Sequence, residues 1–186
     1  MLSLYLQSEN VVLKLISSEA INGIIDFYSR NHERIAKYNP AIPDEYFNAG
    51  YWENKVRYRN SILKRERALD LLIFLPEYPD RVIGHVRIFN IESAPRYCCE
   101  IGYSIDGLLE GRGYMRDAIC LALSFIKNGL ALHRVTALCH PDNIRSKKLL
   151  SSIGFEEEGV LHDALLLDSN WQDMVLLFLL VDRDEC

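Results

Sequence analysis

The sequence has few of the features that mark proteins outside the ordinary globular class. Its 186 residues include 6 prolines and 10 glycines, and no linker rich in either divides the chain. Hydrophobic residues make up 49% and charged residues 25%, which is an ordinary globular balance. Internal repeats and low-complexity stretches are also missing. The sequence therefore predicts one folded domain over residues 1–186, long enough to bury a substantial core.

An excess of basic residues is missing as well. The formal net charge is −5, whereas a duplex-binding surface needs surplus lysine and arginine to neutralise phosphates. We therefore expect no nucleic-acid partner. The apolar run at residues 175–181 is too short to span a bilayer and predicts a buried strand. Because the N-terminus lacks the basic segment and cleavage site of a signal peptide, we expect a cytoplasmic protein without a membrane partner.

The 5 cysteines and 5 histidines form no recognisable metal or disulfide pattern. The cysteine count is odd and no C-x-x-C spacing occurs, so we expect free thiols in a reducing compartment. The histidines show neither an H-E-x-x-H motif nor paired-ligand spacing. The sequence therefore predicts no metal site.

Hydrophobic patterning predicts a mixed α/β (α+β) fold. Residues 115, 119, 122 and 126 place an apolar stripe on one helical face, and this helix connects two strands that we expect to be parallel, with a right-handed crossover. We expect a mixed sheet of about seven strands with about four helices on its two faces. The expected strands are 11–16, 68–75, 81–91, 97–105, 133–140, 155–167 and 171–181, and the expected helices are 17–30, 50–67, 113–126 and 143–153.

A glycine-rich turn, Gly111-Arg112-Gly113, lies between a predicted strand and a predicted helix. Glycine lets the backbone approach a ligand closely, and a helix N-terminus presents unpaired N–H groups and partial positive charge. Arg112 and Arg116 would add charge to this anion site, although a plain tight loop is the alternative. A dinucleotide-binding fingerprint is disfavoured because its third glycine is replaced by Arg116 and residues 132–136 lack an acid.

Two blocks of sequence resemble the GCN5-related N-acetyltransferases (GNAT). Residues 100–118, EIGYSIDGLLEGRGYMRDA, are similar to the acyl-CoA motif of this family. Residues 132–137, LHRVTA, and 141–159, PDNIRSKKLLSSIGFEEEG, are similar to the motif that follows it. The tail at 165–174, LLLDSNWQDM, resembles the RimJ/RimL branch, which acetylates α-amino groups of ribosomal proteins. The sequence departs from the family at Leu108, where Gln or Arg is common.

The resemblance implies a mostly antiparallel, twisted sheet that is split in a V at an acetyl-CoA site. It implies that Asn143 binds the cofactor arm and that Ser146 lies near the thioester sulfur as a proton donor. For both residues a helix cap is the alternative, since polar side chains favour that position. The residues implied in cofactor binding are Tyr103, Ser104, Ile105, Leu109, Gly111, Arg112, Gly113, Tyr114, Met115, Arg116, Asn143 and Ser146.

The general base is less clearly marked. Glu100 is the best candidate, directly or through water, and a structural carboxylate is the alternative. A related branch uses a glutamate before the terminal hairpin, where this chain has Leu165, and His162 and Asp163 are weaker substitutes. Aromatic residues near the proline loop and the last turn are candidates for the acceptor site, with core packing as the alternative. These candidates are Tyr38, Tyr46, Trp52 and Trp171, with Phe47 and Tyr51 beside them.

We therefore expect an acetyl-CoA-dependent N-acetyltransferase, active as a monomer or homodimer, that acts on the α-amine of a protein or peptide. Direct attack in a ternary complex is favoured over an acyl-cysteine intermediate, for which Cys99 is the candidate thiol. Two alternatives remain open. One is a detoxifying transferase for an amine-bearing antibiotic or aminoacyl-nucleotide, and the other is a CoA-binding sensor without turnover.

Overall fold

The computed structural model describes residues 4–62, 68–167 and 169–181. Within these ranges an eight-stranded sheet runs in the order β1-β2-β3-β4-β5-β6-β8-β7. Neighbouring strands are antiparallel except β5 and β6, which are parallel as predicted. The strands are β1 (Tyr5–Gln7), β2 (Val12–Leu15), β3 (Ala68–Phe74), β4 (Gly84–Glu92), β5 (Cys98–Ile105), β6 (Arg134–Cys139), β7 (Glu156–Leu167) and β8 (Asn170–Leu180).

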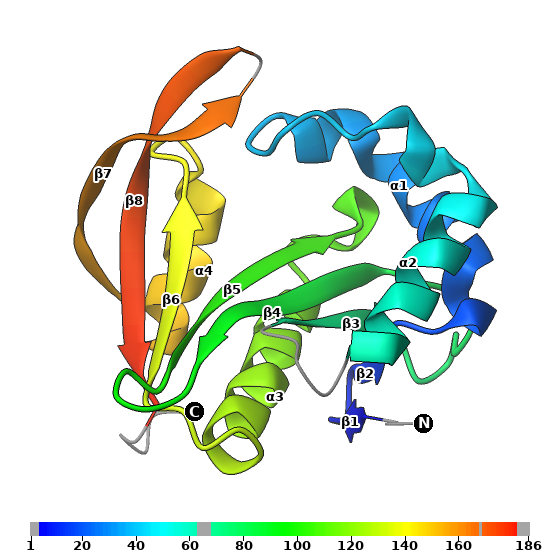
Figure 1. Cartoon of the computed structure of the whole chain (residues 1–186), viewed down its shortest axis with the longest axis horizontal. Coiled ribbons are helices and arrows are strands. Elements are labelled where there is room, and N and C mark those ends of the chain that lie inside the picture. The colour runs from blue at the N-terminus through cyan, green and yellow to red at the C-terminus, as the bar shows by residue number, and fades with distance from the viewer. Residues whose placement is uncertain (1–3, 63–67, 168, 182–186) are drawn as a thin grey trace.

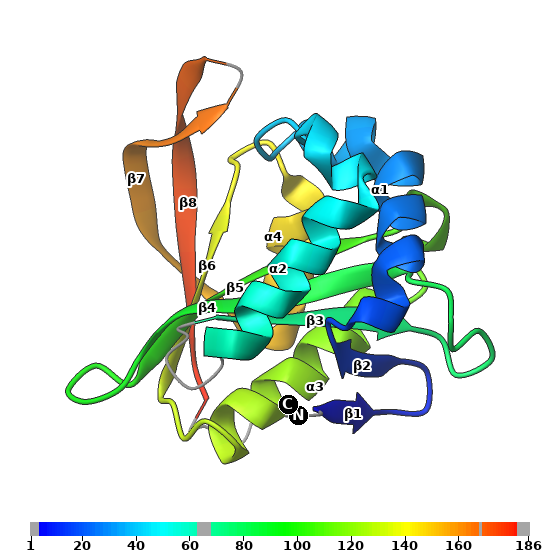
Figure 2. The same ribbon diagram turned by 45° about the vertical axis from the view of Figure 1, so that its right-hand side comes forward.

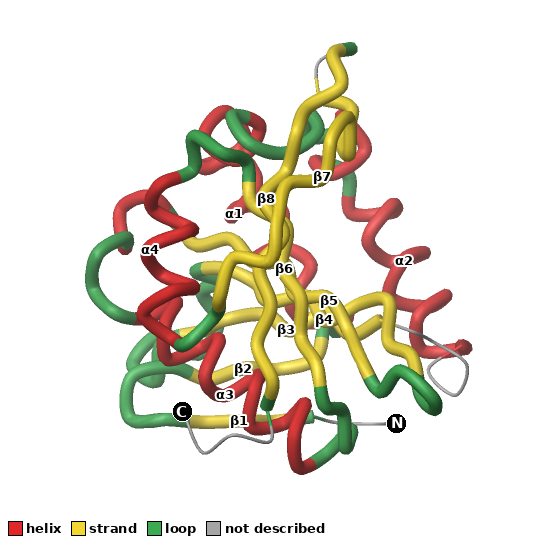
Figure 3. The backbone as a smooth tube through the Cα atoms, turned by 90° about the vertical axis from the view of Figure 1, so that its left-hand side faces the viewer, coloured by secondary structure: helices red, strands yellow, loops and turns green. Residues whose placement is uncertain are grey.

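Helices cover both faces of the sheet, as Figure 3 shows with α3 and α4 on one side and α2 on the other. The helices are α1 (Ile21–Ala36), α2 (Ala49–Ile62), α3 (Tyr114–Asn128) and α4 (Ile144–Ile153), with short 3₁₀ turns at Ser18–Ala20, Asp44–Phe47 and Gly107–Leu109. None of the helices described here is long and apolar enough to cross a membrane. The sheet separates two layers of helices: α1 and α2 cover one face, and α3 and α4 cover the other (Figure 2).

Each layer has its own buried core. Phe27 of α1 is 1% exposed and packs in one cluster with Leu72 and Phe74 of β3. The other cluster contains the α3 stripe predicted from residues 115, 119, 122 and 126, all of them buried, together with Leu150 of α4. Burial of a large aliphatic side chain stabilises a fold by roughly 1.5–3 kcal/mol, so both layers hold their helices firmly against the sheet.

The sheet opens between β5 and β6. The two strands pair only from Cys98 with Arg134 to Glu100 with Thr136. Beyond Glu100 they diverge, with β3, β4 and β5 on one arm of the V and β6, β7 and β8 on the other (Figure 1). The split implied by the family resemblance is therefore present, and its apex lies at Glu100.

Several element boundaries differ from the predictions. Strand β1 was not predicted, because three residues are too few to show a period of two. Helix α1 was predicted to end at residue 30 but continues to Ala36, because Asn31 and Ile35 extend its buried face by further turns. The predicted helix at 50–67 begins at Ala49 and reaches Ile62, and residues 63–67 lie outside the described ranges, as does residue 168 of the predicted turn. Gly154 ends α4 with φ of 106°, as predicted.

Candidate active site

The glycine turn has the geometry of an anion cradle. Gly111 and Gly113 have φ of 75° and 85°, which only glycine adopts without strain. A Cβ built on either glycine would meet nothing within 4 Å, so the space in front of the turn is open. Gly113 is the N-cap of α3 and, in the described chain, no side chain caps the helix. The first-turn N–H groups of Tyr114, Met115 and Arg116 lack intrahelical acceptors and fit a pyrophosphate group.

The loop before this turn is anchored by a buried carboxylate. Asp106 is 2% exposed and forms ion pairs with Arg30 of α1 and, at 3.6 Å, with Arg81. Its Oδ1 accepts a hydrogen bond from the Leu108 N–H at 3.1 Å. The Leu109 N–H donates to the Asp106 carbonyl at 2.9 Å, so this predicted cofactor contact is already used inside the loop. The loop is therefore held in one conformation by charge and backbone bonds together.

A second carboxylate joins three elements at the mouth of the split. Glu110 accepts from Arg34 of α1 at 2.6 Å and also pairs with Arg145 of α4. Arg34 also donates to the carbonyl of Ile105. Burial, and then the nearby charge of Arg145, lower the pKa of the Arg34 guanidinium. Sequence reasoning missed these arginines, because charged residues on a helix resemble a solvated face until the fold brings the helix to the loop.

Ser146 faces the gap from the first turn of α4. The Asn143 side chain accepts from the Ser146 N–H at 3.1 Å, so Asn143 is a helix cap in this structure. The Ser146 hydroxyl lies 2.8 Å from the Tyr103 hydroxyl of β5. Burial raises the pKa of the neighbouring Cys139 thiol, and hydrogen bonding to Ser146 opposes that rise. Two predicted cofactor residues, Tyr103 and Ser146, are therefore in direct contact across the split.

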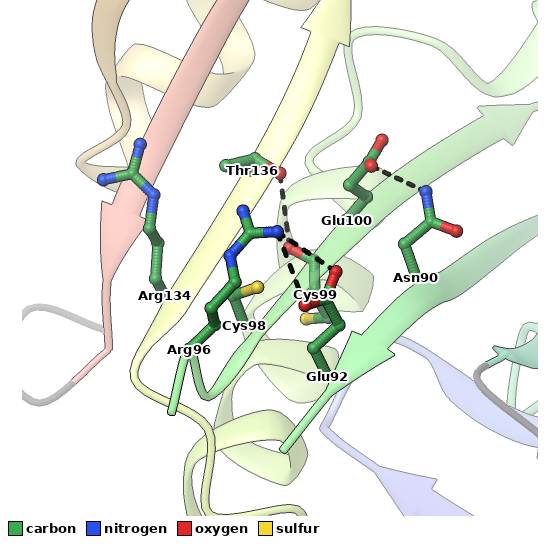
Figure 4. Close-up of a pocket in the computed structure, with 8 residues that line it drawn as sticks. All are labelled: Asn90, Glu92, Arg96, Cys98, Cys99, Glu100, Arg134 and Thr136. Carbon is green, nitrogen blue, oxygen red and sulfur yellow. Dashed lines mark hydrogen bonds and ion pairs between the residues drawn. The ribbon is translucent and has the colours of Figure 1, made fainter. Parts of the chain in front are cut away.

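Glu100 lies in a polar pocket at the apex of the split. The pocket has a volume of about 130 Å³ and is lined by Asn90, Glu92, Arg96, Cys98, Cys99, Glu100, Arg134 and Thr136 (Figure 4). The Asn90 side chain donates to the Glu100 carboxylate at 2.7 Å. Thr136 donates to the Cys99 carbonyl at 3.3 Å. Glu100 therefore has a fixed orientation and an open volume in front of it.

Glu100 and Ser146 flank β5 from opposite faces. Side chains alternate along a strand, so Glu100 shares a face with Gly102 and Ser104, whereas Tyr103 points toward α4 and Ser146. Tyr103 is three residue steps along the strand from Glu100, or about 10 Å at 3.3 Å per residue. A reacting group held in the gap between β5 and β6 would thus meet a carboxylate on one side and a hydroxyl on the other.

The predicted acceptor residues fall into three places. Trp52 is 3% exposed and donates to the Tyr46 carbonyl at 2.8 Å, within a cluster that includes Tyr28 and Tyr51. The Lys55 ammonium lies over the rings of Tyr46, Tyr51 and Trp52 at 4.9, 5.3 and 4.7 Å from their centroids. This cluster packs α1 against α2.

The other two acceptor candidates lie apart from that cluster. Tyr38 contacts the His140 ring at 5.5 Å and reaches the Asp142 carbonyl at 3.4 Å, joining the end of α1 to the loop before α4. Trp171 is 60% exposed at the start of β8 and, among the described residues, makes no ring contact with the cluster. Nearby, His162 pairs with Asp173 at 2.9 Å on the exposed β7–β8 hairpin.

The described cysteines are all free thiols. Cys99, the candidate for an acyl-cysteine, is 1% exposed and points into the core under α3. Burial, followed by Cys98 and Glu100, raises the pKa of Cys99 to about 12. A protonated, buried thiol is a poor nucleophile, so the geometry disfavours an acyl-enzyme on Cys99.

Comparison with known proteins places this site in a family. Residues 10–156 match the model described as an acetyltransferase (GNAT) domain. The chain is 28% identical over 171 residues to the [ribosomal protein uS5]-alanine N-acetyltransferase of Escherichia coli, covering 92% of this chain and 88% of that protein.

Solved structures show the same fold. The ribosomal-protein-S5-alanine acetyltransferase of Vibrio fischeri superposes with a TM-score of 0.89 at 26% identity, covering 98% of this chain and 99% of that one. Mycobacterium smegmatis RimJ, solved in complex with CoA-disulfide, has a TM-score of 0.87 at 20% identity, covering 99% and 89% of the two chains.

A split sheet with an anion cradle at one helix and a carboxylate at the apex defines an acyl-CoA-dependent acyltransferase. The family match extends over most of the sequence and includes both the cradle and the β5–β6 split. The chain belongs to the GNAT family and is an acetyl-CoA-dependent N-acetyltransferase.

Proposed function

We propose that this enzyme acetylates the α-amine of a protein N-terminus, as the names of its relatives that act on ribosomal proteins suggest. The observation that carries the proposal is the similarity to the uS5-alanine N-acetyltransferase over 92% of this chain, which spans both faces of the site. A protein α-amine has a pKa near 8 and a lysine amine one near 10.4, so the α-amine needs less deprotonation at neutral pH. The reaction would take place in the cytoplasm, in one acetyltransferase domain formed by the continuous sheet.

Acetyl-CoA supplies an acetyl group activated as a thioester. The amides of Gly113, Tyr114 and Met115 would hold its pyrophosphate, with Gly111 giving the turn its shape and Arg112 and Arg116 adding positive charge. The cradle supports this fit, because the turn has open space in front of it and α3 has no side-chain cap in the described chain. Along β5, the backbone of Tyr103, Ser104 and Ile105 would bind the pantetheine arm, with Asn143 beside it on the facing helix.

The acceptor would enter from the side of α1 and α2. Glu100 would take the proton of the amine, directly or through a water molecule in the pocket that it shares with Asn90. Ser146, on the other face of β5, would donate a hydrogen bond to the leaving sulfur. Because Cys99 is buried and held protonated, we favour direct attack by the amine over transfer through an enzyme thiol.

Tyr38, Tyr46 and Trp171 would contact the acceptor peptide, and Trp52 would support Tyr46 from beneath through its indole hydrogen bond. Tyr46 and Tyr38 approach the acceptor side of the split from different elements, η2 (Asp44–Phe47) and the segment after α1. Trp171 lies on the opposite arm, where the exposed hairpin offers it to a partner. These positions support a peptide that lies across the open face of the V.

An acceptor screen tests the proposal. Peptides beginning with Ala, Ser or Asp are compared with their N-terminally blocked forms, with aminoglycosides and with an aminoacyl-nucleotide, and free CoA is measured. We expect turnover that depends on a free peptide N-terminus and that adds one acetyl group by mass spectrometry. Turnover confined to the antibiotics would identify a detoxifying transferase. Tight CoA binding without turnover on any acceptor would identify a sensor.

A further inference from the structure

A hydrogen bond crosses the split where the sheet itself no longer does. Tyr103 lies beyond Glu100, the last residue at which β5 pairs with β6. Its hydroxyl nevertheless contacts the Ser146 hydroxyl on α4 at 2.8 Å. The bond therefore links the two arms of the V at the level of the residue proposed to face the leaving sulfur.

The surroundings determine how this bond is oriented. Burial raises the pKa of the Tyr103 phenol far above its usual value, and the bond to Ser146 offsets only part of that rise, so Tyr103 keeps its proton. The Ser146 N–H is occupied by Asn143. A serine hydroxyl has one proton to donate and two lone pairs to accept with. If Tyr103 donates, Ser146 accepts on one lone pair and its own proton is left to point elsewhere in the gap.

The sulfur of Cys139 lies next to Ser146 in the same gap. Hydrogen bonding with Ser146 opposes the rise that burial causes in the pKa of the Cys139 thiol, and the Cys139 Sγ donates to the Asn143 carbonyl at 3.5 Å. The Ser146 hydroxyl thus has both the Tyr103 hydroxyl and the Cys139 thiol as neighbours.

We propose that Tyr103 is a positioning residue for the acetyl transfer: its hydroxyl donates to Ser146 and so aims the Ser146 proton at the leaving sulfur. This inference rests on the proposed role of Ser146. In the transfer the amine nitrogen bonds to the acetyl carbon, the carbon–sulfur bond breaks with its electron pair going to sulfur, and the amine proton leaves to Glu100. A thiol has a pKa of about 8.5, so a hydrogen bond is enough to stabilise the thiolate and Ser146 keeps its own proton.

The test uses the full chain with Tyr103→Phe, Ser146→Ala and the double variant. Tyr103→Phe keeps the ring and removes only the hydroxyl. We expect kcat to fall about tenfold, the effect of one lost hydrogen bond, while the KM for acetyl-CoA changes little. Ser146→Ala lowers kcat at least as much, and Tyr103→Phe in the Ser146→Ala background adds almost nothing, because Tyr103 acts through Ser146.

A second readout does not depend on turnover. The pKa of the thiol of bound CoA is measured from the ultraviolet absorbance of its thiolate as pH is raised. A donor aimed at the sulfur lowers that pKa, so we expect it below the value for free CoA in the wild type, raised in Tyr103→Phe and raised further in Ser146→Ala. Tyr78→Phe, at a tyrosine that is 61% exposed in the turn before β4, is the control and should change neither readout.

The outcomes distinguish the role of Ser146 from that of Tyr103. If Ser146→Ala changes neither kcat nor the thiol pKa, the proposed role of Ser146 fails and the inference fails with it. If Ser146→Ala changes both and Tyr103→Phe changes neither, only the inference is overturned. Full additivity in the double variant would also overturn it, since Tyr103 would then act independently of Ser146.

Discussion

At the scale of single residues, the two faces of β5 would divide the work of the proposed reaction. Glu100 accepts a hydrogen bond from Asn90 at 2.7 Å, whereas Tyr103 faces α4, with its hydroxyl 2.8 Å from that of Ser146. In the proposed reaction the amine and the leaving sulfur would thus meet groups that do not compete for the same space. A strand places successive side chains on opposite faces, so a single strand at the split could provide both functions.

Substitution of Glu100 by Gln tests the acceptor side. The amide keeps the size of the side chain but cannot take a proton, so we expect kcat to fall by roughly 10²–10⁴-fold. The affinity for acetyl-CoA, measured by calorimetry, should be unchanged, because Glu100 points away from the cradle. Wild-type kcat across pH 6–9 would remove Glu100 from the mechanism. Glu92→Gln, at the same pocket but paired with Arg96, is the matched control and should keep kcat within a few-fold.

The residues of the site differ in how far sequence could predict them. Gly111, Gly113 and Ser146 lie in motifs whose spacing is visible in the chain, and the resemblance assigned their roles. Glu110 and Arg34 also lie at the mouth of the split, but their contact joins positions far apart in sequence. An arginine on a polar helix face gives no local sign that it will meet a loop carboxylate. Only the packing of α1 against the sheet reveals that contact.

At the scale of elements, α1 serves as a brace for the glycine turn. Arg30 and Arg34 are one helical turn apart and reach Asp106 and Glu110, which flank the loop before α3. Glu110 extends the connection to Arg145 on α4. Helix α1 lies in a different layer from α3 and α4, yet all three helices meet at this loop. The cradle is therefore held by three elements and not by its own turn alone.

Glu110→Gln should weaken this brace. The change leaves two guanidinium groups without their shared carboxylate, and we expect a loss of about 1–3 kcal/mol in the free energy of unfolding, measured with urea. Saturating CoA should recover part of that loss, because its phosphates supply negative charge nearby. Asp26→Asn breaks the exposed pair between Asp26 and Arg30 and, as the control, should cost less than about 1 kcal/mol. Equal losses in both variants would contradict a special role for Glu110.

The elements themselves were largely predictable. Strands β2 to β8 and all four helices were predicted from the sequence. The exceptions have physical causes: β1 is too short to show a period, and the last turns of α1 are polar except where Asn31 and Ile35 enter the core. Asn31 is buried because its side chain bonds the Phe27 carbonyl and the Gly107 N–H. The Gly107 partner cannot be predicted from the sequence, because only the fold brings it to Asn31.

At the scale of the whole molecule, the sheet separates the layer of α3 and α4 from the layer of α1 and α2. On the side of α1 and α2 lies His85 of β4, whose ring packs on Phe27 at 5.9 Å and on Tyr28 at 6.2 Å. Burial, followed by the charges of Lys55 and Arg87, lowers the pKa of His85 to about 4. The folded protein therefore keeps His85 neutral at pH values where the unfolded chain would protonate it.

This difference makes the stability of the whole chain depend on pH. The pKa of His85 is depressed on folding from about 6.5 to about 4, so the unfolded state binds more protons between those values. Stability is full above pH 6.5 and is lost as the pH falls toward 4, by roughly 1–2 kcal/mol from pH 7 to pH 5. Urea unfolding at both pH values measures it. His85→Phe should flatten the dependence, and His32→Gln, at an exposed histidine, should leave it as it is.

The two outermost strands of the sheet, β1 and β7, are both poorly suited to pairing with another chain. An exposed edge strand offers unpaired N–H and C=O groups to other chains and invites aggregation. Here β1 has only three residues, and the pairing of β7 with β8 slips between Glu157 and Gly159 and again between Leu161 and Leu165. Exposed Glu156, Glu157 and Glu158 add like charge to β7. Neither edge strand presents a straight, uncharged row of unpaired backbone groups. The enzyme can therefore keep an open V at its centre without promoting edge-to-edge association of sheets.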